Sequence, residues 1–241
     1  MMRLLADETT KLLRGCELFD GVDEAGLAEA ARLGAARSAA RHATLFREGE
    51  PADTFMVVVS GRVKLTQVGA DGQEVIVRYV GPGEMCAVVA VFPDAAYPAT
   101  ATAVEATRVL AWPRSEVERL LRRQPAVALN ALRILSARTR ELQERVRELA
   151  TEKVAQRIAR ALIRLARQAG RRVEGGVLID LPLSREDLAK VAGTTLFTVS
   201  RTLSAWEADG IVSTGRERVL IRRPHGLVEI AEDLAAGRNE R

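Results

Sequence analysis

The strongest constraint on the fold is an apolar repeat in the middle of the chain. The segment from Ala126 to Ala169 contains neither glycine nor proline, so we expect it to be helical. Within it, core-type positions recur in alternating steps of four and three residues over three heptads, which is the spacing of a coiled-coil seam. The members of this seam are Ala128, Leu132, Leu135, Thr139, Leu142, Val146 and Leu149.

A stripe this narrow needs a second helix to cover it. Because the repeat continues away from any predicted strand, we expect the partner to be the same helix of a second copy, in a parallel homodimer. The alternative is that the helix packs on its own domain. Thr139 is the polar member of the seam, and it would let two paired helices shift relative to each other.

The charge is distributed unevenly along the chain. With 241 residues the chain is long enough for two modest domains. Residues 1–150 carry as many basic as acidic side chains, so the whole net charge of +4 lies in residues 151–241. This asymmetry favours a polyanion partner for the C-terminal part, although a solvated basic face would give the same count.

The cysteine count and the hydropathy indicate the compartment. Cys16 and Cys86 are too few for a disulfide framework, and no signal segment opens the chain. The longest apolar run, residues 85–92, is too short to span a bilayer. We therefore expect a cytoplasmic protein without membrane contact.

The segment from Thr44 to Trp112 is typical of an antiparallel β domain and follows two short predicted helices, at residues 4–13 and 22–33. Its β-rich runs are separated by the turn signals Ser60-Gly61, Asp71-Gly72 and Gly81-Pro82-Gly83. Several short strands at this spacing predict a small barrel or roll.

After the seam, a new stripe formed by Val154, Ile158, Leu162 and Leu165 belongs to a different core. We therefore predict a sensor domain over residues 1–124, a dimerisation helix over 125–150 and a third part over 151–241. The predicted fold class is α+β, with an N-terminal antiparallel β-roll, a long helix and a C-terminal winged helix-turn-helix.

The elements of the third part follow from local signals. A strand is expected at residues 177–181, and Ser184 with Asp187 forms a capping-box signature for a helix through Val191. A tight turn at residues 192–194 leads to a second helix over residues 195–208. Two short strands around residues 215–218 then form a hairpin with a basic tip. Helix, turn, helix and basic hairpin are the parts of a winged helix-turn-helix.

The second helix carries two different faces. Leu196, Val199, Leu203 and Trp206 fall on one stripe, which we expect to face the domain core. Phe197 and Arg201 lie on the opposite face. A phenyl ring there can touch thymine methyl groups, and an arginine can donate two hydrogen bonds to guanine. The alternative is that Phe197 packs on a neighbouring helix or on the wing.

The predicted DNA-binding residues come from the start of this helix, the turn before it, the N-cap of the first helix and the hairpin tip. They are Ser184, Thr194, Thr195, Leu196, Phe197, Thr198, Ser200, Arg201, Arg216 and Arg218.

Taken in order, the chain resembles the CRP/FNR superfamily of bacterial transcription regulators over roughly residues 15–230. The resemblance is carried by "FREGEPADTFMVVVSGRVKL", by "GPGEM", by the long helix and by "DLAKVAGTTLFTVSRTLSAWEADGIV". It implies an N-terminal effector domain of the cyclic-nucleotide-binding type, a homodimer, and a winged helix that reads a palindromic site in double-stranded DNA. It also implies RNA polymerase as a partner.

The effector domain departs from the cyclic-nucleotide binders of this superfamily. Their Gly-Glu pair, which holds the ribose, is matched here by Ala87-Val88, and their phosphate-binding Arg-Ser pair by Tyr97-Pro98. A phosphate without an arginine, and with a proline removing a backbone donor, would be poorly held, so we expect that cyclic AMP is not the effector.

The residues do not identify the signal to which the effector domain responds. The predicted effector pocket has become apolar and consists of Met85, Cys86, Val88, Val89, Tyr97 and Thr100, and Phe92 lies next to it. It suits a flat hydrophobic cofactor such as haem, or no ligand. An iron–sulfur cluster needs about four thiolates and is disfavoured, and no metal site is predicted. The "YPATA" segment resembles the matching segment in branches of the superfamily that respond to nitrogen oxides or low oxygen. Haem, nitric oxide and a redox change are therefore the candidate signals.

The recognition helix departs as well, because many relatives carry a glutamate where this chain has Phe197. That glutamate accepts a hydrogen bond from a cytosine, which a phenyl ring cannot do. The leading hypothesis is thus a DNA-binding regulator, with an activator as the favoured type. The alternative is a regulatory or scaffold protein whose winged helix binds protein. We do not expect an enzyme, since no paired carboxylates, metal-ligand cluster or nucleophile motif is found.

Overall fold

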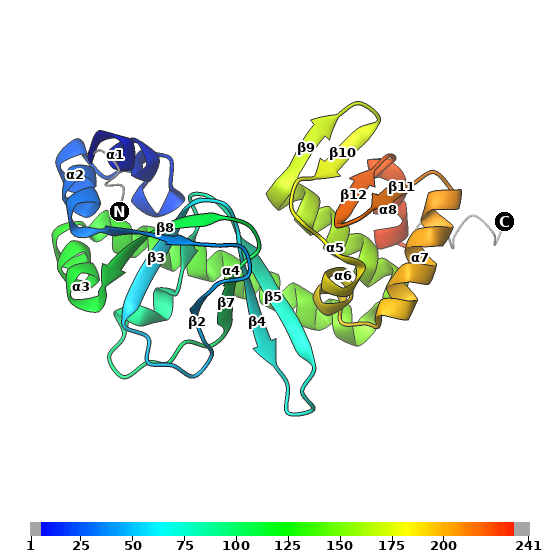
Figure 1. Ribbon diagram of the computed structural model, residues 1–241, viewed down its shortest axis with the longest axis horizontal. Coiled ribbons are helices and arrows are strands. Elements are labelled where there is room, and N and C mark those ends of the chain that lie inside the picture. The colour runs from blue at the N-terminus through cyan, green and yellow to red at the C-terminus, as the bar shows by residue number, and fades with distance from the viewer. Residues whose placement is uncertain (1–5, 234–241) are drawn as a thin grey trace. The chain divides into compact units, whose positions relative to one another are not determined.

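The computed structural model describes residues 6–233, and the chain divides into two compact units (Figure 1). The first unit comprises the residues up to 69 together with 77–141. The second comprises residues 70–76 together with those from 142 onward. Among the described helices, none is both long and apolar enough to cross a membrane.

The first unit opens with short helices. They are α1 (Ala6–Arg14), the 3-10 helix η1 (Glu17–Phe19) and α2 (Glu24–Leu33). The side chain of Asp23 caps α2 by accepting a 2.8 Å hydrogen bond from the backbone N–H of Gly26. Both short helices expected near the start of the chain are therefore present, and residues 4 and 5 of the first expected helix lie outside the described residues.

Two four-stranded antiparallel sheets form the predicted roll. One has the order β1 (Ala35–Ala39), β8 (Thr107–Pro113), β3 (Thr54–Ser60) and β6 (Met85–Cys86). The other has the order β2 (Thr44–Phe46), β7 (Thr100–Ala103), β4 (Val63–Val68) and β5 (Glu74–Val80). A short 3-10 helix, η2 (Val88–Val91), follows β6 and is entered through Ala87, whose φ is 63°.

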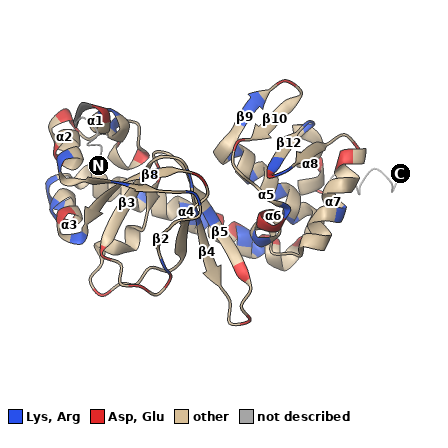
Figure 2. Cartoon of the chain, in the orientation of Figure 1, with Lys and Arg blue, Asp and Glu red and all other residues tan. Residues whose placement is uncertain are grey.

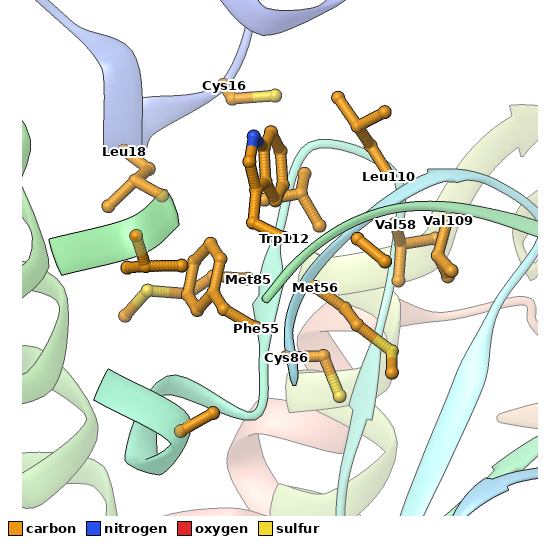
Figure 3. Close-up of a cluster of buried hydrophobic side chains, with 14 of the residues drawn as sticks. Cys16, Leu18, Phe55, Met56, Val58, Met85, Cys86, Val109, Leu110 and Trp112 are labelled. Atoms are coloured by element: carbon orange, nitrogen blue, oxygen red, sulfur yellow. The ribbon is translucent and has the colours of Figure 1, made fainter. Parts of the chain in front are cut away.

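The core of this unit is built around Trp112, which is completely buried (Figure 3). The rings of Phe19 and Phe55 lie 6.2 and 5.7 Å from the tryptophan ring. The indole N–H donates a 2.8 Å hydrogen bond to the carbonyl of Ala30. The buried polar edge of the ring is thus satisfied, and the N-terminal helices are attached to β8.

After α3 (Arg114–Arg123), the long helix α4 runs from Pro125 to Thr151. The amide of Asn130 fixes its beginning by donating to the carbonyls of Leu18 and Asp20, at 3.1 and 2.8 Å. The seam is largely uncovered by the described residues of the chain: Ala128 and Leu135 are half-buried, and the rest are exposed. Val146 is the most exposed of its apolar members, at 67%. The described part of the chain therefore leaves most of the seam uncovered. The alternative, in which the helix packs its seam on its own domain, does not hold.

The second unit contains the predicted winged helix-turn-helix. Its elements are α5 (Val154–Ala169), β9 (Gly170–Val173), β10 (Gly176–Ile179), α6 (Arg185–Ala192), α7 (Leu196–Ala208), β11 (Val212–Gly215), β12 (Arg218–Ile221) and α8 (Pro224–Ala231). The four strands form one sheet in the order β11-β12-β10-β9. Strand β9 was not expected from the sequence.

The boundary between the two compact units differs from the predicted domain boundary. The expected boundary follows residue 150, where the seam ends, whereas the packing divides α4 itself between residues 141 and 142. The reason is that the last turns of α4 are attached to the winged helix: Arg145 donates to the carbonyl of Val191, and Glu148 pairs with Arg164 of α5.

Candidate nucleic-acid interface

The turn between α6 and α7 is set by local sequence signals. The hydroxyl of Ser184 accepts a 2.9 Å hydrogen bond from the N–H of Asp187, whose carboxylate accepts from the backbone N–H of Ser184 at 3.2 Å. This is the capping box that the sequence predicts. Gly193 ends α6 with φ +62°, and a Cβ at this position would lie 2.9 Å from a methyl group of Leu149. Glycine therefore allows both the left-handed turn and the close approach of α4.

Helix α7 begins at the cap that its sequence indicates. The hydroxyl of Thr195 accepts a 3.2 Å hydrogen bond from the N–H of Thr198, and the two hydroxyl oxygens are 2.9 Å apart. Val199, Leu203 and Trp206 are buried and anchor the helix. The predicted core stripe is thus confirmed for three of its four members.

Leu196 is the exception, and this prediction was wrong. It is the first residue of α7 and is 50% exposed. At the very end of the helix its side chain lies beyond the hydrophobic core, so helical phase alone does not bury it. Leu196 instead lies on the exposed face of α7 that is predicted to bind DNA.

Phe197 is the most exposed large hydrophobic side chain of this helix, at 75%. The guanidinium carbon of Arg201 lies 5.9 Å from the centre of its ring. A cation–π contact of this kind at an exposed site contributes about 0.5–1 kcal/mol and keeps the two side chains together on one face. Phe197 packs neither on a neighbouring helix nor in the core, so that alternative is excluded.

The wing is tied to both helices. Leu183, just before α6, donates from its N–H to the carbonyl of Glu217 at the hairpin tip, at 3.1 Å. Arg185 donates to the hydroxyl of Thr214 at 3.0 Å, and the N–H of Thr214 donates to Glu207 of α7 at 2.6 Å. No local sequence signal predicts this network, since its members are far apart in the chain and match no motif.

The structure brings most of the predicted DNA-binding residues onto exposed parts of this one unit. Residues 194–201 lie together at the turn and on the first two turns of α7, and the basic tip lies on a separate hairpin; Figure 2 shows basic positions on the strands and helices of this unit. Ser184 is half-buried, and its hydroxyl is already engaged with Asp187. The exposed members are Thr195, Leu196, Phe197, Arg201, Arg216 and Arg218, and Thr194, Thr198 and Ser200 are half-buried.

Three of the six residues of the predicted effector pocket, Met85, Cys86 and Tyr97, are buried. Tyr97 is buried: its ring stacks on Phe46 with centroids 4.0 Å apart, and its hydroxyl donates to the carbonyl of Thr54 at 3.1 Å. Cys86 is buried, which raises the pKa of its thiol to about 12. Met85 is buried as well, Val88, Val89 and Thr100 are half-buried, and Phe92 is exposed.

A cavity of about 300 Å³ lies beside these residues, in the first unit. Of the predicted pocket it shares only Met85. The lining residues are Gly15, Glu17, Arg78, Pro82, Gly83, Glu84, Met85, Ile134, Ala137, Arg138 and Glu141. This lining is rich in charge and contains neither a histidine nor a cysteine. Within residues 6–233, no three His, Cys, Asp or Glu side chains gather as a metal-ligand set.

Both units of the chain match models of known protein families. Residues 36–124 match the model of the cyclic nucleotide-binding domain, and residues 156–230 match the Crp-like helix-turn-helix domain. The chain is 35% identical to the cyclic AMP receptor protein of Thermus thermophilus over 191 residues, which are 79% of this chain and 85% of that protein. It is 26% identical to the CRP-like cAMP-activated global transcriptional regulator of Mycobacterium tuberculosis, over 88% of this chain and 94% of that protein.

Solved structures agree with these matches. The structure of FixK2 from Bradyrhizobium japonicum superposes with a TM-score of 0.72 at 25% identity, covering 82% of this chain and 96% of that chain. The catabolite activator protein of Thermus thermophilus gives a TM-score of 0.52 at 32% identity, covering 90% and 99%.

Proposed function

Because the chain belongs to the CRP/FNR family of transcription regulators, we propose that it is a cytoplasmic homodimer that binds palindromic double-stranded DNA and regulates transcription in response to a signal at the roll. The relatives are transcription regulators rather than enzymes, and no catalytic role is proposed for this chain.

The exposed pair of Phe197 and Arg201 on α7 is the main support for the proposal that the chain binds DNA. Leaving a phenyl ring in water forgoes about 2 kcal/mol of burial free energy, so the ring is best explained by a partner that covers it. In a major groove the ring meets thymine methyl groups, and Arg201 meets guanine. The exposed Arg216 and Arg218 of the wing are suited to phosphates.

The uncovered seam on α4 supports the homodimer. Five of its seven members are exposed, four of them large apolar side chains, in a regular coiled-coil spacing. Pairing of two such helices presents two winged helices related by twofold symmetry. The half-sites of the DNA would then lie about 34–36 Å apart, one turn of the duplex.

The regulatory step follows from the same helix. We propose that a signal other than cyclic AMP acts at the roll, shifts the two α4 helices and reorients the winged helices toward their half-sites, where RNA polymerase is the further partner. The proposal that cyclic AMP is not the effector rests on Ala87-Val88 and Tyr97-Pro98, which the resemblance to the family matches to the ribose and phosphate ligands of the binders. Micromolar binding of cyclic AMP in a calorimetric titration would contradict it.

A gel-shift titration against duplex DNA at several salt concentrations tests DNA binding against the alternative, in which the winged helix binds protein. We expect an affinity that falls steeply as salt rises, because basic residues displace counterions from the phosphates. Absence of a shifted complex at low salt would instead favour the protein-binding alternative.

A further inference from the structure

A second, smaller cavity lies in the second unit, where the end of α4, helix α5 and the end of α6 meet. Its volume of about 10 Å³ gives room for one particle of roughly the size of a water molecule. Leu149, Val191 and Ala192 form the apolar part of its lining, and the other lining side chains are charged. The cavity shares no residue with the predicted effector pocket or with the predicted DNA-binding residues.

The charged part of the lining has an excess of positive charge. Arg145, Arg157 and Arg164 line the cavity together with a single carboxylate, that of Glu148, so three positive charges face one negative charge. Glu148 is buried, and both of its oxygens already accept hydrogen bonds from Arg164 at 2.7 Å. Burial and the charge of Arg164 lower the pKa of Arg145, because both disfavour its charged form.

The negative groups around the cavity do not remove this excess. Glu152, which follows α4, accepts from Arg160 at 2.9 Å and from Arg147 at 3.2 Å, so its charge is already balanced. The C-terminal end of α6 accepts from Arg145 and Arg157, but a helix end is equivalent to only about half a negative charge. Positive charge in the lining therefore remains uncompensated.

Arg157 also carries a donor for which the protein supplies no acceptor. One terminal nitrogen of its guanidinium donates to the carbonyl of Gly193 at 3.1 Å. Its Nε–H is buried and has no hydrogen-bond partner within residues 6–233. A buried donor without an acceptor is unfavourable. A water molecule in the cavity would supply only the acceptor, whereas an anion would supply the acceptor and the missing charge.

We propose that this cavity binds a halide ion, which is chloride in ordinary solution. The ion accepts a hydrogen bond from Arg157 and balances the charges of Arg145 and Arg164. Tetrahedral oxyanions such as phosphate and sulfate are too large for a cavity of this volume. Bound chloride joins α4 and α5 to the end of α6, and it stabilises this arrangement by mass action. The site is independent of the signal at the roll and of binding to DNA.

Broadening of the nuclear magnetic resonance line of chloride by the whole chain tests the proposal, because exchange of the ion with a protein site widens the line of the free ion. At constant ionic strength we expect saturable broadening that bromide reverses and phosphate does not. Arg157→Gln should weaken chloride binding roughly tenfold or more, because a charge and a hydrogen-bond donor are lost. The matched control is Arg167→Gln, at an exposed position of the same helix, which should bind like the unmodified protein.

Three results overturn the proposal. They are broadening that does not saturate, equal broadening by Arg157→Gln and the unmodified protein, and reversal by phosphate as readily as by bromide, which would place the ion on surface arginines. If circular dichroism shows that Arg157→Gln does not fold, Arg157→Lys replaces it. Lysine keeps the charge but lacks the Nε–H donor, so chloride binding should weaken several-fold, and unchanged affinity would overturn the proposal.

Discussion

The guanidinium of Arg145, in the last turns of α4, donates a 2.6 Å hydrogen bond to the carbonyl oxygen of Val191, in the last turn of α6. Arg157 of α5 donates in the same way to the carbonyl of Gly193, at 3.1 Å. Both arginines therefore hold carbonyls at the C-terminal end of α6, where the helix dipole favours positive charge. The helix that carries the coiled-coil seam is thus attached directly to the turn that positions α7.

Arg145→Ala should loosen this attachment. We expect the discrimination between palindromes whose half-site spacing differs by one base pair to decrease, because α4 no longer fixes the position of the turn. Thermal unfolding should show a loss of roughly 1.5–3 kcal/mol, as for a hydrogen bond to a charged group. Arg140→Ala is the control. Unchanged spacing discrimination in gel shifts would mean that the contact only stabilises the fold.

Phe197→Glu should change base preference and leave the fold intact. The side chain is exposed, so the free energy of unfolding should change by no more than about 0.5 kcal/mol. A carboxylate at this position accepts from the amino group of cytosine, whereas the ring contacts a thymine methyl group. Sequencing of selected DNA should show the replacement of thymine by cytosine at one position in each half-site. An unchanged preference would place Phe197 outside the groove.

Arg201→Ala and Arg218→Ala should separate base contacts from phosphate contacts. Loss of Arg201 should weaken binding to the specific site by about 1–3 kcal/mol and relax the preference at one base pair. Loss of Arg218 should weaken binding to all sequences alike and reduce the salt slope by about one. Fluorescence anisotropy at several salt concentrations measures both. Identical behaviour of the two variants would argue against the assignment.

Val146→Glu should dissociate the dimer. It puts a charge at the most exposed apolar position of the seam, where two copies would meet face to face. Analytical ultracentrifugation should show a monomer, and affinity for a palindrome should fall to that of one half-site. Glu144→Lys changes an exposed residue outside the seam and should leave the dimer intact. Dimers that persist in Val146→Glu would locate the interface elsewhere.

The two thiols should be unreactive in the native protein. Burial raises the pKa of Cys16 to about 11 and that of Cys86 to about 12, from an ordinary value of 9.0. Because the folded chain holds these protons more tightly, the resulting stability is present below pH 9 and is lost as the pH rises toward these values. Labelling with iodoacetamide near pH 8 should require unfolding. Rapid labelling of the native protein would show that a thiol is accessible.

Much of the second unit was predictable because its signals are local. The Ser184–Asp187 capping box, the left-handed Gly193 and the Thr195 cap are each specified within a few residues, so the helix limits follow from the sequence. The seam on α4 is equally local, since helical spacing alone defines it. The exposed position of Phe197 followed from its phase relative to Val199 and Leu203.

The remaining features depend on contacts that no local pattern encodes. Arg145 and Val191 are brought together by the packing of α4 on the winged helix. The cavity in the first unit needs three segments that are distant in the chain, and the stacking of Tyr97 on Phe46 likewise joins distant residues. The prediction that Leu196 is buried was wrong for a related reason. Helical phase gives the direction in which a side chain points, but not where the hydrophobic core ends.

Selection from a random pool of duplex DNA by the whole chain of 241 residues shows whether a symmetric dimer binds DNA sequence-specifically. We expect an enriched palindrome whose half-sites are centred one helical turn apart, about 34–36 Å. Enrichment of a single asymmetric site, or of no sequence at all, would contradict it.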